Sequence, residues 1–188
     1  MPRLHGMNSL MRGLRRWMRR LWALLILAVL LLILALLRPS EMLVTADGTR
    51  VYVVDGDSLR IGPRDVRLKG IDAVELRQSC NGADGGQWSC GVEARQALQD
   101  LVARGDLRCQ ASEGDQFGRA IALCSVTGVS DVAAELVSAG WAVSGDGARA
   151  GDYADEQGQA KSASKGIWRG TFERPAEWRK AHPRETEE

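Results

Sequence analysis

The chain has 188 residues and a formal net charge of +1, but this total averages two unlike parts. Residues 1–40 contain seven Arg and no Asp or Glu, whereas residues 41–188 contain 18 basic and 24 acidic groups and carry a net charge of −6. A body of this size can bury one ordinary core. Its acidic balance excludes a strongly basic nucleic-acid-binding surface, although a local basic site remains compatible with it.

An apolar segment at residues 21–37 predicts a membrane helix. It runs for 17 residues without a charge, Gly or Pro, and about 1.5 Å per residue gives it a length of roughly 25 Å, the short end of a transmembrane span. Six Arg precede it, so the positive-inside rule places residues 1–20 in the cytoplasm and the body outside it, in a periplasmic or other extracytoplasmic space. We expect a single-pass signal anchor in the lipid bilayer; the alternative is a cleaved signal peptide.

The body is expected to be one α+β domain at residues 49–180, after a linker at residues 38–48 that ends in a lead-in strand and before a polar tail at 181–188. Apolar and β-branched runs predict strands at 51–54, 58–61 and 66–71, followed by a long loop at 72–89. Helical spacing predicts helices at 92–102, 131–139 and 153–165. This order is typical of a small β-meander or barrel with three helices. We expect the body to be a monomer, and no protein partner can be deduced.

Four Cys lie in the body, and none of them forms a C-x-x-C pair, which argues against a zinc site. Residues 107–111 and 119–124 read as a hairpin whose turn is centred between Gln116 and Phe117, which places Cys109 opposite Cys124. Opposed strand residues are close enough for a disulfide, and closing this loop stabilises by about 3 kcal/mol. Cys80 and Cys90 would then form a second disulfide that closes the Gly-rich loop between them. The alternative is four reduced, buried thiols.

The candidate chemistry lies in carboxylates and arginines, because both His are in the terminal segments and a Ser–His–Asp or Cys–His site is poorly supported. Asp57 follows the first strand, while Asp72 and Glu75 follow the third. If these strands are neighbours, Asp57 and Asp72 could share a cation, and Glu75 could deprotonate a water molecule.

Two arginines complete this hypothesis. Arg67 in the third strand and Arg119 after the 115–118 turn could bind one phosphate, since a guanidinium donates two hydrogen bonds to its oxygens. The simpler interpretation is that residues 55–57 form an ordinary turn, that Arg67 is a surface or ion-paired residue, and that Glu75 is solvated.

Five short motifs resemble the staphylococcal nuclease (thermonuclease) family, in the family's order and at similar intervals. They are V-D-G-D-S-L at 54–59, R-L-K-G-I-D-A-V-E at 67–75, D-Q-F-G-R at 115–119, G-W-A at 140–142 and G-I-W at 166–168. The resemblance covers roughly residues 48–180. It implies an OB-fold, a five-stranded β-barrel with three helices, and Ca²⁺-dependent cleavage of DNA and RNA to 3′-phosphates.

Carried over by position, the resemblance implies roles for individual residues. Asp57, Asp72 and the backbone carbonyl of Ala73 would bind Ca²⁺, and Glu75 would act as general base. Arg67 and Arg119 would bind the scissile phosphate and stabilise its transition state.

The sequence also departs from the family pattern. Val74 replaces the usual Pro before Glu75, so the Glu75 loop is expected to be looser. Gln116 and Phe117 replace a Lys-Tyr pair that contacts substrate, and Phe117 can stack but cannot donate a hydroxyl hydrogen.

The expected function is therefore a membrane-anchored, Ca²⁺-dependent thermonuclease-like phosphodiesterase, an endonuclease acting on DNA or RNA outside the cytoplasm. The alternative is a catalytically weak or inactive OB-fold domain that binds or scaffolds in the cell envelope. A third possibility is an envelope-assembly protein that depends chiefly on its membrane helix.

Overall fold

The computed structural model describes residues 17, 18, 20–22, 24–30, 43–44, 47–145 and 152–183. The chain divides into two units, Met1–Glu41 and Met42–Glu188. In the first unit the described residues between 17 and 30 are helical. Among all described residues, no helix combines the length and apolar character needed to cross a membrane. The predicted anchor at 21–37 extends beyond residue 30, and most of both predicted tails also lies outside the described residues.

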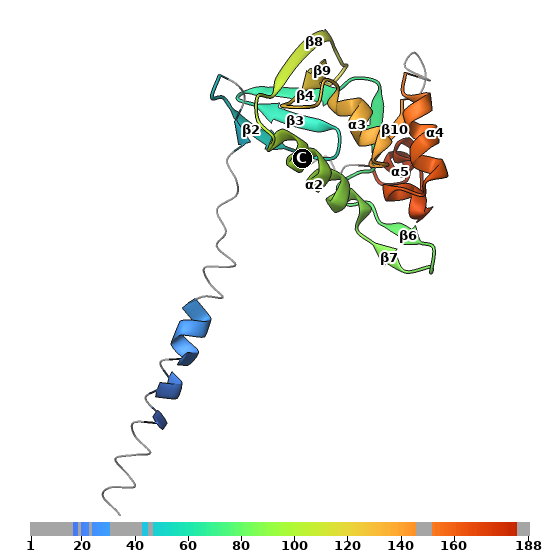
Figure 1. Ribbon diagram of the computed structural model, residues 1–188. Coiled ribbons are helices and arrows are strands. Elements are labelled where there is room, and N and C mark those ends of the chain that lie inside the picture. Colours follow the sequence, from blue (N-terminus) through green and yellow to red (C-terminus); the bar gives the residue numbers. More distant parts are fainter. Residues whose placement is uncertain are drawn as a thin grey trace, which may run out of the picture. The chain divides into compact units, whose positions relative to one another are not determined.

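The main sheet of the second unit has six strands in the order β1-β2-β3-β4-β9-β8 (Figure 1). From β1 to β4, each strand is antiparallel to the next, whereas β4 and β9 run parallel. Val51 and Val53 in β2, together with Leu59, Val66 and Leu68, turn toward the core, as the alternation of apolar residues predicts. The bounds of these strands are Leu43–Val44 for β1, Arg50–Val53 for β2, Ser58–Ile61 for β3, Arg64–Leu68 for β4, Arg108–Gly114 for β8 and Ala120–Ser125 for β9.

The predicted third strand, residues 66–71, is in fact two strands. β4 ends at Leu68, and β5 (Ile71–Ala73) begins after Gly70, whose φ of +79° suits glycine and turns the chain. β5 then pairs with β10 (Ala142–Ser144) instead of continuing the main sheet. This break takes Asp72 out of the β4 ladder and into β5, and Glu75 follows two residues after β5 ends.

The stretch predicted as a loop at residues 72–89 contains strands as well. β6 (Cys80–Gly82) and β7 (Gln87–Trp88) form a hairpin, and β11 (Gly170–Thr171) pairs with β6. The Cys80–Cys90 disulfide closes this hairpin onto the next helix. The Gly-rich sequence of these strands lacks the alternation of apolar and polar residues from which strands are predicted. The disulfide and the pairing with β11 hold the hairpin in place instead.

The Cys109–Cys124 disulfide is also confirmed, and the two Cys lie directly opposite each other in β8 and β9. The predicted register holds from Cys109 to Ala111, and then a bulge at Ser112 shifts it by one residue. The turn is therefore centred on Phe117, half a residue beyond the predicted position. The described residues contain no free cysteine.

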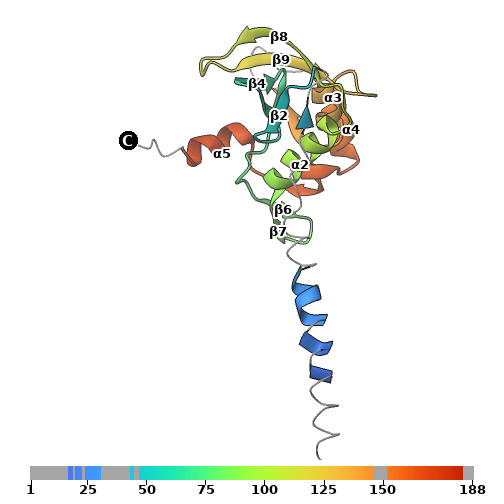
Figure 2. The ribbon, with the colours of Figure 1, turned by 90° about the vertical axis from the view of Figure 1, so that its left-hand side faces the viewer.

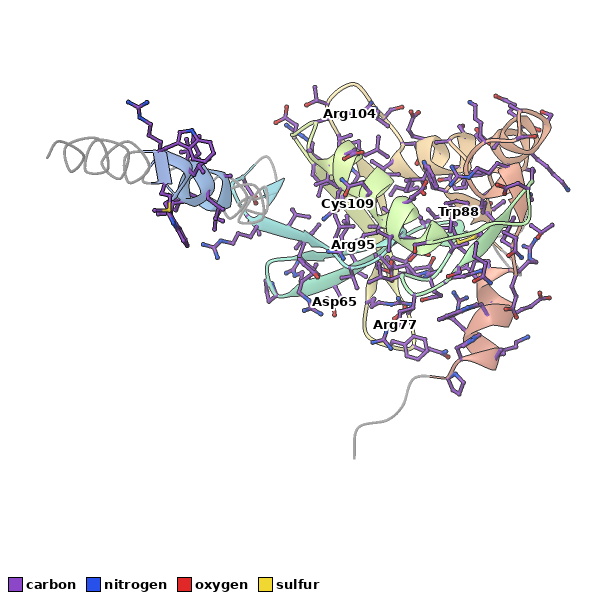
Figure 3. The ribbon with its side chains drawn as sticks, turned by 90° about the horizontal axis from the view of Figure 1, so that it is seen from below. Asp65, Arg77, Trp88, Arg95, Arg104 and Cys109 are labelled. Atoms are coloured by element: carbon purple, nitrogen blue, oxygen red, sulfur yellow. A yellow bond between two sulfur atoms is a disulfide. The ribbon has the colours of Figure 1, made fainter. Side chains whose placement is uncertain are left out.

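The predicted helices are present, with shifted ends. Asp131 caps α3, since its carboxylate accepts from the backbone N–H groups of Ala133 and Ala134 at 2.9 and 3.1 Å. Arg95 fastens α2 to the sheet by donating to the Val53 carbonyl at 3.1 Å (Figure 3). The helices are α2 at Cys90–Val102, α3 at Val132–Ser138, α4 at Ala154–Ser162, a 3₁₀ helix at Gly166–Arg169 and α5 at Pro175–Ala181.

The expected count of five strands and three helices is too low for the described residues of the body. The additional helix, α5, begins with Pro175 at its first position, where the missing N–H costs nothing. Of its residues only Pro175 is buried, and Figure 2 shows α5 standing out from the rest of the body. The architecture remains α+β, with a sheet-rich core and helices packed around it.

Candidate active site

Asp57 occupies the end of the β2–β3 turn and is almost completely buried, with 3% of its surface exposed. Its Oδ1 accepts from the Ser58 hydroxyl at 2.8 Å, and its Oδ2 accepts from the backbone N–H of Ala73 at 3.0 Å. Burial raises the pKa of Asp57 to about 6, even though Arg67 opposes this shift. A buried carboxylate with a raised pKa is a group that a cation would stabilise in its charged form.

Arg67 joins the two carboxylates that were predicted to share a cation. From β4 it donates to Asp57 Oδ1 at 3.0 Å through Nη1, and its Nη2 lies 2.9 Å from Asp57 Oδ2 and 2.6 Å from Asp72 Oδ1. Although burial alone would lower it, the pKa of Arg67 is raised by the charges of Asp57 and Asp72. The predicted neighbourhood of Asp57, Arg67 and Asp72 is therefore present, with the guanidinium between the two acids.

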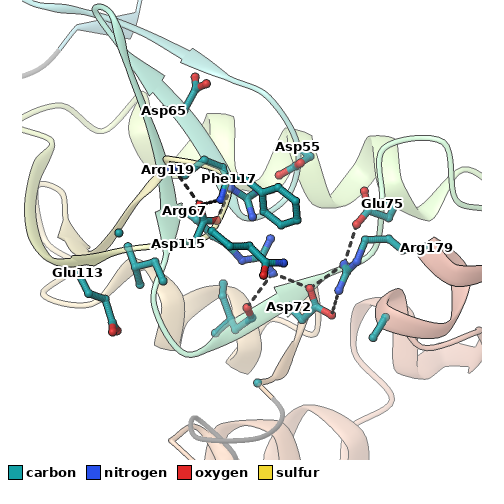
Figure 4. A pocket seen from close by; sticks show the side chains of 16 residues that line it. Asp55, Asp65, Arg67, Asp72, Glu75, Glu113, Asp115, Phe117, Arg119 and Arg179 are labelled. Carbon is teal, nitrogen blue, oxygen red and sulfur yellow. Dashed lines mark hydrogen bonds and ion pairs between the residues drawn. The ribbon is translucent and has the colours of Figure 1, made fainter. Parts of the chain in front are cut away.

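Glu75 is connected to this group through Arg179, a residue of α5 to which the sequence had assigned no role. Arg179 Nη1 lies 2.9 Å from Asp72 Oδ1 and 2.7 Å from Glu75 Oε1, and its Nη2 donates to Asp72 Oδ2 at 3.0 Å. Figure 4 shows Arg67 and Arg179 reaching Asp72 from opposite sides. Sequence reasoning missed Arg179 because it is 104 residues from Glu75 and belongs to no short motif.

Arg119 lies on the same pocket but has a different partner. Its Nε donates to Asp115 Oδ2 at 2.7 Å, across the β8–β9 turn. The Phe117 side chain at the tip of this turn is 74% exposed, and the Arg119 guanidinium lies 5.6 Å from its ring centroid. An exposed aromatic ring beside a guanidinium is the kind of surface on which a nucleobase stacks.

These side chains surround one pocket of about 820 Å³. It brings together the predicted residues Arg67, Asp72, Glu75 and Arg119, with Gln116 and Phe117 at the turn. Six carboxylates and three guanidinium groups line it, so the wall is acidic on balance. The charged lining residues are Asp55, Asp65, Asp72, Glu75, Glu113, Asp115, Arg67, Arg119 and Arg179.

The predicted metal ligands Asp57 and Ala73 are not part of this wall. Both are buried behind it, and the N–H of Ala73 donates to Asp57. Within the described part of the chain, no group of three His, Cys, Asp or Glu is arranged to hold a metal ion. The donors nevertheless fit a hard cation such as Ca²⁺ in kind, because Asp57 and Asp72 offer carboxylate oxygens and both contact one guanidinium nitrogen. Guanidinium groups hold these oxygens in the structure.

Packing and hydrogen bonds surround the Glu75 loop, in which Val74 takes the place of the usual Pro. Val74 is fully buried in the second apolar cluster. Gln78, also buried, accepts from the N–H of Glu75 at 3.1 Å and donates to the carbonyl of Glu173 at 2.6 Å. At Gly91 in α2, any Cβ would overlap the Glu75 carbonyl, so this position requires glycine.

Comparison with known proteins agrees with the geometry. The family model described as staphylococcal nuclease homologue matches residues 65–170. The chain is 37% identical over 118 residues to the succinoglycan biosynthesis protein ExoI of Rhizobium meliloti (strain 1021), an alignment that covers 62% of each protein. It therefore spans less than two thirds of that relative. The family match includes Arg67, Asp72, Glu75 and Arg119 but ends before Arg179, and because it covers more than half of the sequence, the chain belongs to the staphylococcal nuclease homologue family.

Proposed function

We propose that the chain is a Ca²⁺-dependent nuclease that hydrolyses phosphodiester bonds of DNA, RNA or both. The observation that carries the proposal is the junction of Asp57, Arg67 and Asp72 beside Glu75. Phosphodiester cleavage requires cationic groups around the phosphate and a base for the attacking water. Membership in a nuclease family supports the reaction class.

Each residue has a chemical role in this proposal. Asp57 and Asp72 would hold Ca²⁺ with the Ala73 carbonyl, and the cation would neutralise charge that develops on the phosphate. Glu75 would accept a proton from water as the water oxygen bonds to phosphorus and the ester P–O bond breaks. Arg67 and Arg119 would donate hydrogen bonds to the phosphate oxygens.

The test is a digestion assay of the purified chain with Ca²⁺, Mg²⁺ or EDTA, with Glu75→Ala and Glu113→Ala measured in parallel. Both glutamates line the pocket, so the two variants remove the same charge from the same wall. We expect Glu75→Ala to lose activity by about 10²-fold or more, whereas Glu113→Ala retains it. Full activity in EDTA, or in Glu75→Ala, contradicts the proposed site.

A binding or biosynthetic role without cleavage is the second candidate. Two observations favour it: the acidic balance of the pocket wall, and the name of the relative, which refers to succinoglycan biosynthesis. A chain that binds an oligonucleotide in Ca²⁺ yet never cleaves it would favour this candidate.

We further propose that residues 21–37 anchor the body on the extracytoplasmic side of a membrane. The support is the apolar run and the Arg excess before it. A C-terminal alkaline phosphatase fusion, which requires export to be active, tests the topology. An inactive fusion beside an active control with an exported leader contradicts it.

A further inference from the structure

Arg179 holds the same oxygens that the proposed cation needs. Three of its contacts, at 2.7 to 3.0 Å, reach both oxygens of Asp72 and one oxygen of Glu75. Arg67 shares Asp72 Oδ1 with it, at 2.6 Å. A carboxylate oxygen has two lone pairs, so Asp72 Oδ1 has none left for a cation while both guanidinium groups stay.

Of the two guanidinium groups, that of Arg179 is the more exposed to solvent. The Arg67 side chain is 15% exposed, lies in the main sheet and has two carboxylate partners on buried or nearly buried residues. The Arg179 side chain is 39% exposed, so solvent weakens its ion pairs. A divalent cation at Asp72 would also repel a guanidinium on the same carboxylate, and the more exposed Arg179, unlike the nearly buried Arg67, can move into solvent.

The attachment of α5 permits such a release. It has seven residues, of which only Pro175 is buried, and a helix this short is not stable alone in water. At its start, Gln78 holds the Glu173 carbonyl at 2.6 Å. In its last turn, the ion pairs of Arg179 bind it to Asp72 and Glu75. Loss of these pairs would free the last turn while Gln78 still holds the beginning.

We propose that Arg179 is an internal counter-ion that competes with Ca²⁺ for Asp72, so that cation binding releases α5 from the pocket and frees Glu75. The inference rests on the proposed function, because it requires the cation to bind at Asp57 and Asp72. It adds to that function a reason for the cation requirement: without the cation, Glu75 is held by a guanidinium rather than being available to water.

The experiment measures Ca²⁺ affinity by isothermal titration calorimetry, without substrate, on the full chain in detergent. Arg179→Gln removes the competitor, and Arg179→Lys keeps the charge but loses the two-pronged contact. Lys180→Gln is the matched control, since it removes one positive charge from an exposed neighbouring position of the same helix. We expect Arg179→Gln to bind Ca²⁺ about tenfold more tightly than wild type, Arg179→Lys to lie between them, and Lys180→Gln to match wild type.

Hydrogen exchange of the α5 amides gives a second readout. Saturating Ca²⁺ is expected to speed exchange in α5 of the wild type and to have no such effect in Arg179→Gln. Unchanged or weaker Ca²⁺ binding by Arg179→Gln overturns the inference, as does equal tightening in Lys180→Gln. If wild type itself binds no Ca²⁺, the proposed cofactor fails as well, which separates that result from a failure of the inference alone.

Discussion

Gly91 offers a sharp test of how the body positions Glu75. It is the second residue of α2, and an added Cβ would overlap the Glu75 carbonyl oxygen and lie 2.7 Å from its carbonyl carbon. Carbon atoms prefer separations of about 3.5–4.0 Å, so Gly91→Ala must move the Glu75 backbone by about 1 Å.

The cost can be estimated from two opposing effects. Overpacking of this kind destabilises by about 1–3 kcal/mol, while Ala in place of Gly favours the helix by up to about 1 kcal/mol. The net loss of unfolding free energy is therefore about 1–2 kcal/mol, a fall in melting temperature of about 2–8 °C. Because a 1 Å displacement of a catalytic group can reduce rates about 10²-fold, we expect the loss of nuclease activity to exceed what unfolding explains.

Gly158→Ala is the matched control, because Gly158 is exposed in α4 and a Cβ there meets no atom within 4 Å. It is expected to raise stability by about 0.5–1 kcal/mol and to leave activity unchanged. Thermal unfolding by circular dichroism and nuclease assays well below the melting temperature would measure both effects. A Gly91→Ala protein as stable and as active as the wild type would refute the argument that Gly91 positions Glu75.

Three further predictions concern two buried polar side chains and one disulfide. Burial raises the pKa of Asp57 from 3.8 to about 6, so in EDTA its contribution to stability is complete below about pH 4 and is lost as the pH rises through 6. Relative to Asp57→Asn, the wild type should lose about 2 kcal/mol between pH 4 and pH 7 in urea unfolding, and parallel pH profiles would contradict this. Gln78→Leu leaves the Glu75 N–H and the Glu173 carbonyl without this partner, and urea unfolding should show a loss of about 2 kcal/mol. Replacing Cys109 and Cys124 with Ser opens a loop with a sequence separation of 15 and should cost about 3 kcal/mol, whereas a loss near zero would argue against the chain-entropy estimate.

Local patterns in the sequence were sufficient to predict the strands β2, β3, β4, β8 and β9, the helices α2 to α4 and the Cys109–Cys124 pairing, but not the short strands β5, β6, β7, β10 and β11. These features depend on residues close in the chain: alternation in β2, the cap at Asp131, and the opposition of two Cys across one turn. The bulge at Ser112 could not be predicted, because it adds one residue without altering the apolar pattern at the two Cys.

The candidate site was predicted in part for the same reason. Asp57 directly precedes β3, Arg67 lies in the neighbouring strand β4, and Asp72 follows in β5, so the three are close in the chain and meet in the structure. The condition set for this prediction was wrong, because β3 lies between the predicted first and third strands. Arg179 required tertiary information: α5 packs on β5 only after the chain has passed through the whole body. The partner of Arg119 is local, yet the phosphate role assigned to Arg119 did not take Asp115 into account.

Each arginine of the pocket is paired with a carboxylate in the structure. Although desolvation opposes it, the pKa of Asp115 is lowered by hydrogen bonds from the backbone and guanidinium of Arg119, so Asp115 stays anionic and keeps its hold on that side chain. The paired carboxylates compete with a phosphate for the guanidinium groups of Arg67, Arg119 and Arg179, and the acidic body offers a phosphate no long-range attraction. In the proposed function, the double positive charge of one Ca²⁺ at Asp57 and Asp72 would weaken the hold of these acids on Arg67 and Arg179. The cation would thus turn an internally paired pocket into one that accepts a polyanion.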